Sequence, residues 1–212
     1  MQPILETDRL VIRRLTEADV DALVALDSDP QVTFFITGGV PEFDEAMLRA
    51  WLSQYERWPG YGTFAAIERS SGAFIGWFHL RPDGDNDDEP ELGYRLRRDA
   101  WGKGYATEGS RALIDRAFAE LGASRVWASA MAVNAASRRV MERAGLRFVR
   151  AFHADWPYRI PGDEHGDVEY AITRAEWQMD RRRAQSSERA DKEARAGEPG
   201  GPGCPQGRCA GG

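Results

Sequence analysis

Cysteine is scarce in this sequence. Its only two cysteines, Cys204 and Cys209, lie close to the C-terminus. The rest of the chain therefore has no disulfide, which is typical of proteins from a reducing compartment, and we expect a cytoplasmic location. A Cys-x4-Cys pair with no histidine nearby is a poor metal site, so we expect no metal cofactor.

Long apolar runs and an excess of basic residues are also missing. No stretch approaches the roughly 18 consecutive apolar residues of a membrane-spanning helix. The first ten residues lack the basic and apolar regions of a signal peptide. The formal net charge of −6 argues against a general nucleic-acid-binding surface, which needs a basic face. We therefore expect neither a membrane nor a nucleic acid as partner.

The composition changes near residue 180. From Asp180 onward the chain is rich in charge, has no apolar periodicity and ends in glycine and proline. Such a segment cannot bury enough apolar surface to offset the entropy that it would lose on ordering. We therefore predict one folded domain over residues 1–179 and a disordered tail over residues 180–212.

Apolar periodicity divides the folded part into strands and helices. Alternating apolar residues predict strands over residues 10–15, 63–68, 73–81, 91–97, 125–130, 146–153 and 167–173. Apolar residues three or four apart predict helices that begin near residues 16, 44, 105 and 135, with a short last helix that ends at Trp177. Residues 34–41 and 83–90 are predicted to be loops. This order indicates an α/β fold with a mixed sheet of about seven strands and helices on both faces.

One glycine-rich stretch stands between a predicted strand and a predicted helix: Asp99-Ala-Trp-Gly-Lys-Gly-Tyr-Ala-Thr-Glu-Gly109. It is no Walker A loop, because Lys103 is followed by glycine, and no dinucleotide fingerprint, because Thr107 replaces the third glycine. Gly102 and Gly104 can still turn successive N–H groups towards one anion, and the following helix adds its own unpaired N–H groups. The stretch therefore predicts an anion-binding loop; a simple turn is the alternative.

Four segments resemble the GNAT superfamily of N-acetyltransferases. Trp101-Gly-Lys-Gly-Tyr-Ala106 resembles its pyrophosphate loop, Arg/Gln-x-x-Gly-x-Gly/Ala. The tryptophan in place of Arg or Gln resembles the branch with the ribosomal-protein N-terminal acetyltransferases (the RimJ/RimL type). Glu6–Arg13 resembles the opening strand of that branch, Glu91–Leu96 the strand that contacts acetyl-CoA, and Asn134–Phe148 the helix and strand that close the cofactor cleft.

The resemblance implies a GNAT-type sheet that splays into a V-shaped cleft. It also implies transfer of acetyl from acetyl-CoA, as co-substrate, to an amine. One backbone N–H near Arg95 or Leu96 would donate to the thioester carbonyl, where charge develops during attack. The implied cofactor-binding residues are Leu96, Arg97, Arg98, Trp101, Gly102, Lys103, Gly104, Tyr105, Ala106, Thr107, Asn134 and Ser137.

Two residues are candidates for the chemistry. Glu91, at the start of the cleft strand, is the candidate base, directly or through a water, with a surface carboxylate as the alternative. Many family members carry a tyrosine acid where this chain has Met141. The resemblance therefore implies Ser137, one turn earlier, as donor to the departing sulfur, with a helix N3 residue as the alternative. Asn134 could cap this helix, and Glu108 is interpreted as complementing a helix dipole.

The sequence leaves the acceptor open, as a small-molecule amine or a protein N-terminus. An acidic loop over residues 83–89 could attract a cationic amine or be only solvated. His79 and His153 are interpreted as structural. Five aromatic residues could wall the acceptor pocket or belong to the core: Phe34, Phe35, Trp77, Trp156 and Tyr158.

The folded part offers no cysteine as a nucleophile. Direct transfer in a ternary complex is therefore favoured over a covalent enzyme intermediate. The alternative function is a non-catalytic acyl-CoA-binding or sensing domain on the same fold. A homodimer formed through edge strands is a further expectation.

Overall fold

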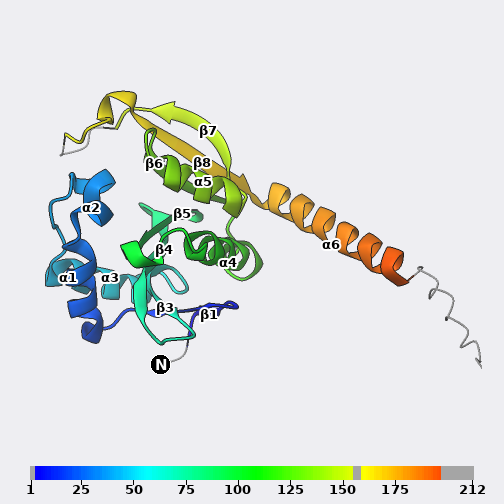
Figure 1. The fold of residues 1–212 in the computed structure, drawn as a ribbon, viewed down its shortest axis with the longest axis horizontal. Helices are drawn as coiled ribbons and strands as arrows, with labels where there is room; N and C mark the ends of the chain where they lie inside the picture. The colour runs from blue at the N-terminus through cyan, green and yellow to red at the C-terminus, as the bar shows by residue number, and fades with distance from the viewer. Residues whose placement is uncertain (1–2, 155–158, 197–212) are drawn as a thin grey trace, which may run out of the picture. The chain divides into compact units, whose positions relative to one another are not determined.

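One sheet organises most of the chain. The computed structural model describes residues 3–154 and 159–196, and within them eight strands lie in the order β1-β2-β3-β4-β5-β6-β8-β7 (Figure 1). Neighbouring strands are antiparallel except β5 and β6, which are parallel. The predicted mixed sheet is thus confirmed, with eight strands among the described residues where about seven were expected. The strands are β1 Leu5–Glu6, β2 Leu10–Arg14, β3 Gly62–Glu68, β4 Phe74–Asp83, β5 Asn86–Leu96, β6 Arg125–Met131, β7 Arg147–Phe152 and β8 Asp167–Thr173.

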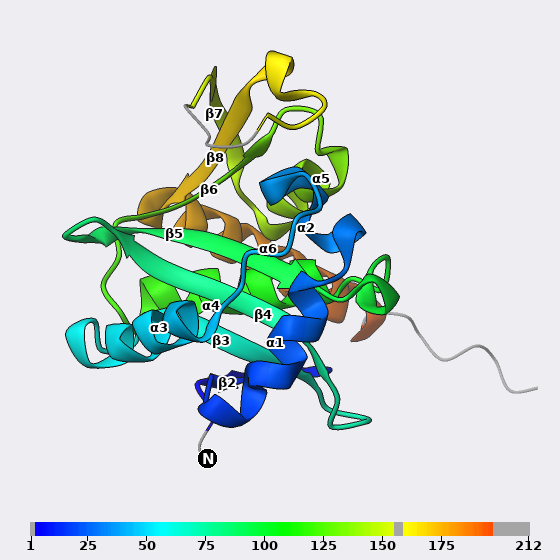
Figure 2. The ribbon, with the colours of Figure 1, turned by 90° about the vertical axis from the view of Figure 1, so that its left-hand side faces the viewer.

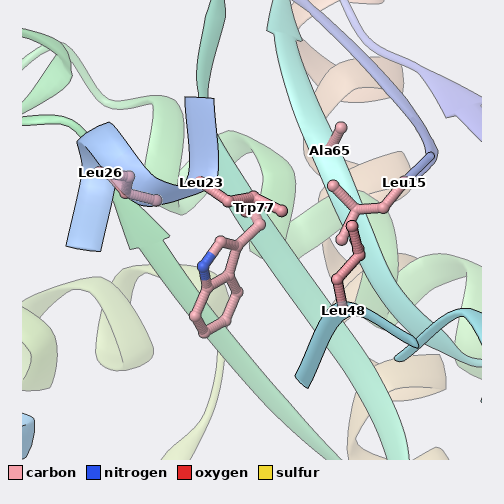
Figure 3. Packing of buried hydrophobic residues seen from close by; sticks show 6 residues of the cluster. All are labelled: Leu15, Leu23, Leu26, Leu48, Ala65 and Trp77. Atoms are coloured by element: carbon pink, nitrogen blue, oxygen red, sulfur yellow. The ribbon is translucent and has the colours of Figure 1, made fainter. Parts of the chain in front are cut away.

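Helices cover both faces of this sheet, as predicted. Figure 2 shows α1 (Val20–Asp27) and α3 (Glu45–Arg57) on one face and α4 (Tyr105–Ala119) on the other. Successive side chains of a strand point to opposite faces, so each face has its own core. The core under α1 and α3 is a buried cluster of Leu15, Leu23, Leu26, Leu48, Ala65 and Trp77 (Figure 3).

Polar caps fix where the helices begin and end. Thr16 and Asp19 form a capping box ahead of α1, and the Asp44 side chain accepts the Met47 N–H at the start of α3. Helix α5 (Ala135–Ala144) ends at Gly145, whose φ of 103° is the left-handed conformation that favours glycine. These helix bounds agree with the sequence predictions because each rests on a local signal.

One helix contradicts the predictions. Residues Phe34–Thr37 were expected in a loop, but they belong to α2 (Pro30–Thr37). Asp29 accepts the Gln31 N–H and Pro30 occupies the first turn, which is a standard helix start. The helix ends at Gly38, with φ of 71°. The prediction was wrong because the following Gly-Gly and Pro41 outweighed this cap.

The acidic segment over residues 83–90 is also not a loop. It forms a hairpin in which β4 ends at Asp83 and β5 begins at Asn86, with Gly84 and Asp85 as the turn. Its carboxylates have partners on neighbouring elements: Asp85 pairs with Arg57 at 2.6 Å and Glu89 with Arg125 at 3.0 Å. Only Glu89 of this pair of acidic residues lies in a strand, and its ion pair with Arg125 offsets part of the negative charge of β5.

The last helix is longer than predicted. Contacts divide the chain into two units, Met1–Arg174 and Ala175–Gly212. Helix α6 (Arg174–Ala196) continues past Trp177, so the tail expected to be disordered from Asp180 is helical up to Ala196. Alanine, arginine, glutamate and lysine are strong helix formers, which explains the difference. Residues 197–212 lie outside the described residues, and the domain boundary at residue 179 stays a prediction. None of the described helices is long and apolar enough to cross a membrane.

Gly109 sets how closely α4 approaches the sheet. A Cβ at this position would collide with the Phe78 ring of β4. Alanine normally favours a helix over glycine by roughly 1 kcal/mol. Here we expect Gly109→Ala to lower the free energy of unfolding by about 1–3 kcal/mol, because overpacking dominates. Urea denaturation measures this.

The double variant Gly109→Ala/Phe78→Leu is the matched control, because a smaller side chain at position 78 makes room for the new methyl group. It should be more stable than the sum of the two single changes predicts. A stabilised Gly109→Ala protein would contradict the packing argument.

Candidate active site

The sheet splits between β5 and β6. Within the described strands these two share one register pair, Glu91 with Trp127. Next to this pair the Trp127 indole N–H donates to the Glu89 carbonyl at 3.1 Å, and Ser124 N–H donates to Asp88 O at 2.8 Å. Beyond Glu91 the strands diverge (Figure 2). The splaying of the sheet that the resemblance implied is therefore present, and the paired end of the split is at Glu91.

The register of β5 decides which backbone groups face the split. Arg97 N–H donates to Ile75 O at 2.8 Å, so in the antiparallel alternation Arg95 also bonds towards β4. Tyr94 and Leu96 then direct their N–H and C=O groups away from β4, into the split. Between the two donors named from the sequence, this alternation favours Leu96. It also turns the Arg97 amide away from the split.

The glycine loop presents unpaired amides. Gly102 and Gly104 have φ of 72° and 85°, and Gly104 is the N-cap of α4 without a side-chain cap. Trp101 N–H donates to Arg98 O at 3.1 Å, and Glu108 N–H donates to Gly104 O at 3.0 Å. Between them, the amides from Gly102 to Thr107 have no protein acceptor among the described residues. Such a row of amides at a helix N-terminus suits an anion.

The side chain of Arg9, near the N-terminus, holds the glycine loop in place from its outer side. Arg9 donates from Nη1 to Lys103 O at 2.8 Å and pairs with Glu108 at 2.5 Å. Glu108 also accepts the Thr7 hydroxyl at 2.6 Å. Burial raises the pKa of Glu108, but the bonds from Thr7 and Arg9 outweigh it and the pKa is lowered. These contacts hold the Glu108 carboxylate between the start of the chain and the glycine loop.

An open groove of about 710 Å³ continues from the loop. It is lined by Gly104 and Thr107 from the loop end, by Arg111 of α4 and by Arg143 of α5. The Arg111 guanidinium donates to Arg143 O at 2.9 Å, which ties the two helices together along the groove. The groove next to the loop thus carries charges of both signs, from the basic residues Arg9, Arg111 and Arg143 and from the acidic residues Asp8, Glu108 and Asp115.

Other predicted cofactor residues have defined partners. The Trp101 indole N–H donates to the split-facing Leu96 O at 2.8 Å. Arg98 binds the start of α2 through Gln31 at 3.1 Å, and the Tyr105 hydroxyl donates to Glu68. Asn134 caps α5 by accepting the Ser137 N–H at 3.0 Å. The structure thus gathers the loop and the end of β5 at one end of the split.

Ser137 lies opposite β5 and contacts a residue that the sequence did not single out. The Tyr94 hydroxyl lies 2.9 Å from Ser137 Oγ and donates to Ser137 O at 3.2 Å. Burial raises the pKa of Tyr94 to about 12. Met141, where the family usually has tyrosine, is only 1% exposed and belongs to the core. The alternation of apolar residues along the strand indicates which face of the sheet Tyr94 is on, but it does not indicate that Tyr94 contacts Ser137.

Glu91 lies on the opposite face of β5. Its Oε2 accepts from Arg81 at 2.7 Å and lies 3.6 Å from Nε2 of His79. Burial, followed by the charges of Arg81 and Arg95, lowers the pKa of His79 well below 6.5. The imidazole is therefore neutral, and its Nε2 has no hydrogen-bond partner among the described residues. It occupies the space above Gly93, where a Cβ would collide with the ring.

A buried ion pair ties this face to α1. Arg95 Nη1 lies 2.5 Å from Asp27, whose other oxygen accepts Phe43 N–H at 2.8 Å. Trp77 packs in the core beneath α1 and α3, so of the aromatic residues proposed for an acceptor pocket it is a core residue. Phe35 on α2 is 37% exposed. Trp156 and Tyr158 lie outside the described residues.

The chain matches known acetyltransferases in sequence and in structure. The acetyltransferase (GNAT) domain family matches residues 9–147. FsC-acetyl coenzyme A-N(2)-transacetylase of Aspergillus fumigatus is 36% identical over 83% of this chain and 78% of its own. A GNAT-family acetyltransferase from Bacillus anthracis is 25% identical with a TM-score of 0.66, over 81% of this chain and 98% of its own. An acetyltransferase from Agrobacterium tumefaciens is 27% identical with a TM-score of 0.62, over 79% and 92%.

The family match covers more than half of the chain, and the split sheet, the amide row and the fold agree with it. The chain therefore belongs to the GNAT acetyltransferases. It is an acetyltransferase, and the name of its fungal relative includes acetyl coenzyme A.

A negative charge introduced at position 104 tests whether the amide row binds an anion. Asn and Asp have nearly the same shape and both tolerate a left-handed φ, so comparing Gly104→Asp with Gly104→Asn isolates the carboxylate. We expect Gly104→Asp to bind acetyl-CoA at least about tenfold more weakly than Gly104→Asn, because a fixed negative charge would repel a diphosphate. Isothermal titration calorimetry measures both affinities. Equal affinities would refute an anion site at these amides.

Proposed function

We propose that the chain transfers acetyl from acetyl-CoA to a primary amine by direct attack in a ternary complex. The observation that carries this proposal is the unpaired amide row of Gly102–Thr107 beside the open edge of β5. The amide row suits the diphosphate of coenzyme A, and the strand edge suits its extended amide-containing arm. The absence of cysteine before Cys204 supports direct attack over an enzyme-bound acetyl group.

In this proposal, each part of the cofactor is bound by a specific group of this chain. The amides of Gly102–Thr107 bind the diphosphate, with Lys103 adding a charge. Backbone groups of Tyr94 pair with the arm, and the Leu96 N–H donates to the thioester oxygen, while Leu96 O stays bonded to the Trp101 indole. A fixed donor there stabilises the negative charge that develops on that oxygen when the amine attacks.

Glu91 serves as the base in this proposal. Arg81 holds Oε2, and Oε1 has no protein donor among the described residues. Oε1 can therefore accept a proton from the acceptor nitrogen, directly or through a water. The neighbouring His79 is neutral, so it does not compete for the carboxylate as a cation.

Ser137 is the proposed donor to the departing sulfur. Its place at the N-terminal end of α5 adds the positive end of the helix dipole, which favours a thiolate. A thiol with a pKa near 8.5 is already a fair leaving group, so a hydrogen bond is enough assistance.

The acceptor is proposed as a primary amine on a small molecule or at a protein N-terminus. The name of the fungal relative includes an N(2) nitrogen, which supports nitrogen as the acceptor. We expect an amine panel to identify the class, with polyamines, amino acids and peptides incubated with acetyl-CoA and products weighed by mass spectrometry. Acetyl-CoA binding with no acetylated product from any amine would instead support the non-catalytic alternative.

The proposed base has a direct test. We expect Glu91→Gln to lower kcat by about 100-fold, because an amide cannot take the proton. The affinity for acetyl-CoA should stay the same in calorimetry. Glu89→Gln is the matched control, since Glu89 lies two residues earlier and pairs with Arg125, and it should keep kcat. A Glu91→Gln enzyme within twofold of the wild type would make Glu91 a surface carboxylate.

A further inference from the structure

The Trp101 indole joins the glycine loop to the open end of β5. Its N–H donates to Leu96 O at 2.8 Å, and Leu96 is the last residue of β5. Leu96 O faces the split, beyond the β5–β6 register pair at Glu91. Between the two residues runs a short turn in which Ala100 N–H donates to Arg97 O at 3.0 Å. The loop is therefore held against the strand by a side chain as well as by the main chain.

The two ends of the proposed cofactor site lie on either side of this hydrogen bond. The amides of Gly102–Thr107 follow Trp101, and the Leu96 N–H comes five residues before it. A ligand that contacts both ends at once binds best when their separation already matches its own length, because ordering the loop on binding would cost affinity. The separation of the amide row from the Leu96 N–H is thus a property that the protein has to fix in advance.

Two side chains hold the glycine loop, one on each side. Arg9 donates to Lys103 O at 2.8 Å and pairs with Glu108, which supports the loop from its outer side. Trp101 supports it on the side of β5. Loss of the indole N–H would therefore leave the amide row formed and would free only its connection to the strand.

The indole also removes an acceptor from the split. An extended chain that enters the split can pair with strand groups in more than one register, and a shift would move its thioester away from the Leu96 N–H. With Leu96 O already bonded to Trp101, Leu96 offers the chain its N–H alone. The hydrogen bond thus favours the register in which that N–H meets the thioester oxygen.

We infer that Trp101 is a positioning residue whose indole N–H holds the glycine loop at the distance from the Leu96 N–H that one molecule of acetyl-CoA spans. The inference rests on the proposed function of the amide row and of Leu96. Trp101 is 46% exposed, so core packing alone does not account for a tryptophan at this position. Its hydrogen bond to the strand does.

The variant Trp101→Phe tests the inference, because it keeps an aromatic ring and deletes the N–H. Isothermal titration calorimetry compares two ligands: acetyl-CoA, which spans both ends of the site, and 3′-phospho-ADP, the nucleotide half of coenzyme A, which carries the diphosphate without the arm. We expect acetyl-CoA to bind about fivefold more weakly than to the wild type, the effect of one hydrogen bond. The affinity for 3′-phospho-ADP should stay within about twofold, because Arg9 still holds the loop at Lys103 O.

Trp127→Phe is the matched control. The Trp127 indole N–H also donates to a carbonyl of β5, Glu89 O at 3.1 Å, but at the paired end of the split. Deleting this hydrogen bond should lower the thermal unfolding temperature and leave both affinities within about twofold of the wild type. The two variants therefore lose the same kind of hydrogen bond from the same strand, and only one of them loses it next to the loop.

Three results overturn the inference: unchanged binding of acetyl-CoA by Trp101→Phe, equal losses for both ligands, or the same selective loss in Trp127→Phe. Equal losses would mean that the indole maintains the amide row itself. Retained binding of 3′-phospho-ADP shows that Trp101→Phe is folded. If the wild type binds neither ligand, the proposed function fails before any variant is compared, so the two failures are distinguishable.

Discussion

The loss of pairing between β5 and β6 after Glu91 and Trp127 is the constraint on which the site depends. Backbone N–H and C=O groups in the middle of a sheet are normally bonded, and leaving them unpaired is costly. Here the divergence leaves the Tyr94 and Leu96 backbone facing a gap, and one group, Leu96 O, is already satisfied by the Trp101 indole. These unpaired groups are the ones that the proposed cofactor arm, an extended and amide-containing chain, would complete, and the amide row lies at the end of the same split.

The alternation of β5 separates two kinds of chemistry. Odd positions carry Glu91 and Arg95 on the α1 and α3 face, where ion pairs with Arg81 and Asp27 hold charged groups in place. Even positions carry Tyr94 on the α4 face, next to Ser137. In the proposed reaction, proton removal from the acceptor and assistance to the sulfur therefore take place on opposite faces of one strand. Gly93 belongs to this arrangement, because its missing side chain leaves room for His79.

Local signals in the sequence predicted most of the fold, but long-range contacts between side chains could not be predicted from the sequence. Strands, capped helices and the glycine loop follow from patterns within about ten residues. Helix α2 was not predicted because a glycine pair follows soon after its Asp29 cap. The hairpin at Gly84 was not predicted because the arginines that pair with its carboxylates are distant in sequence. The Tyr94–Ser137 contact joins residues 43 positions apart, and no periodicity reports such a partner.

The hydrogen bond from Arg9 to the glycine loop couples the first strands to the proposed cofactor-binding region. Arg9 and Lys103 are 94 positions apart, yet the loop carbonyl is bonded to that guanidinium. A change that moves Arg9 away from the loop would remove the hydrogen bond to the Lys103 carbonyl. In the proposed enzyme, coenzyme affinity would then depend on a residue that lies at the far end of the sheet from the split.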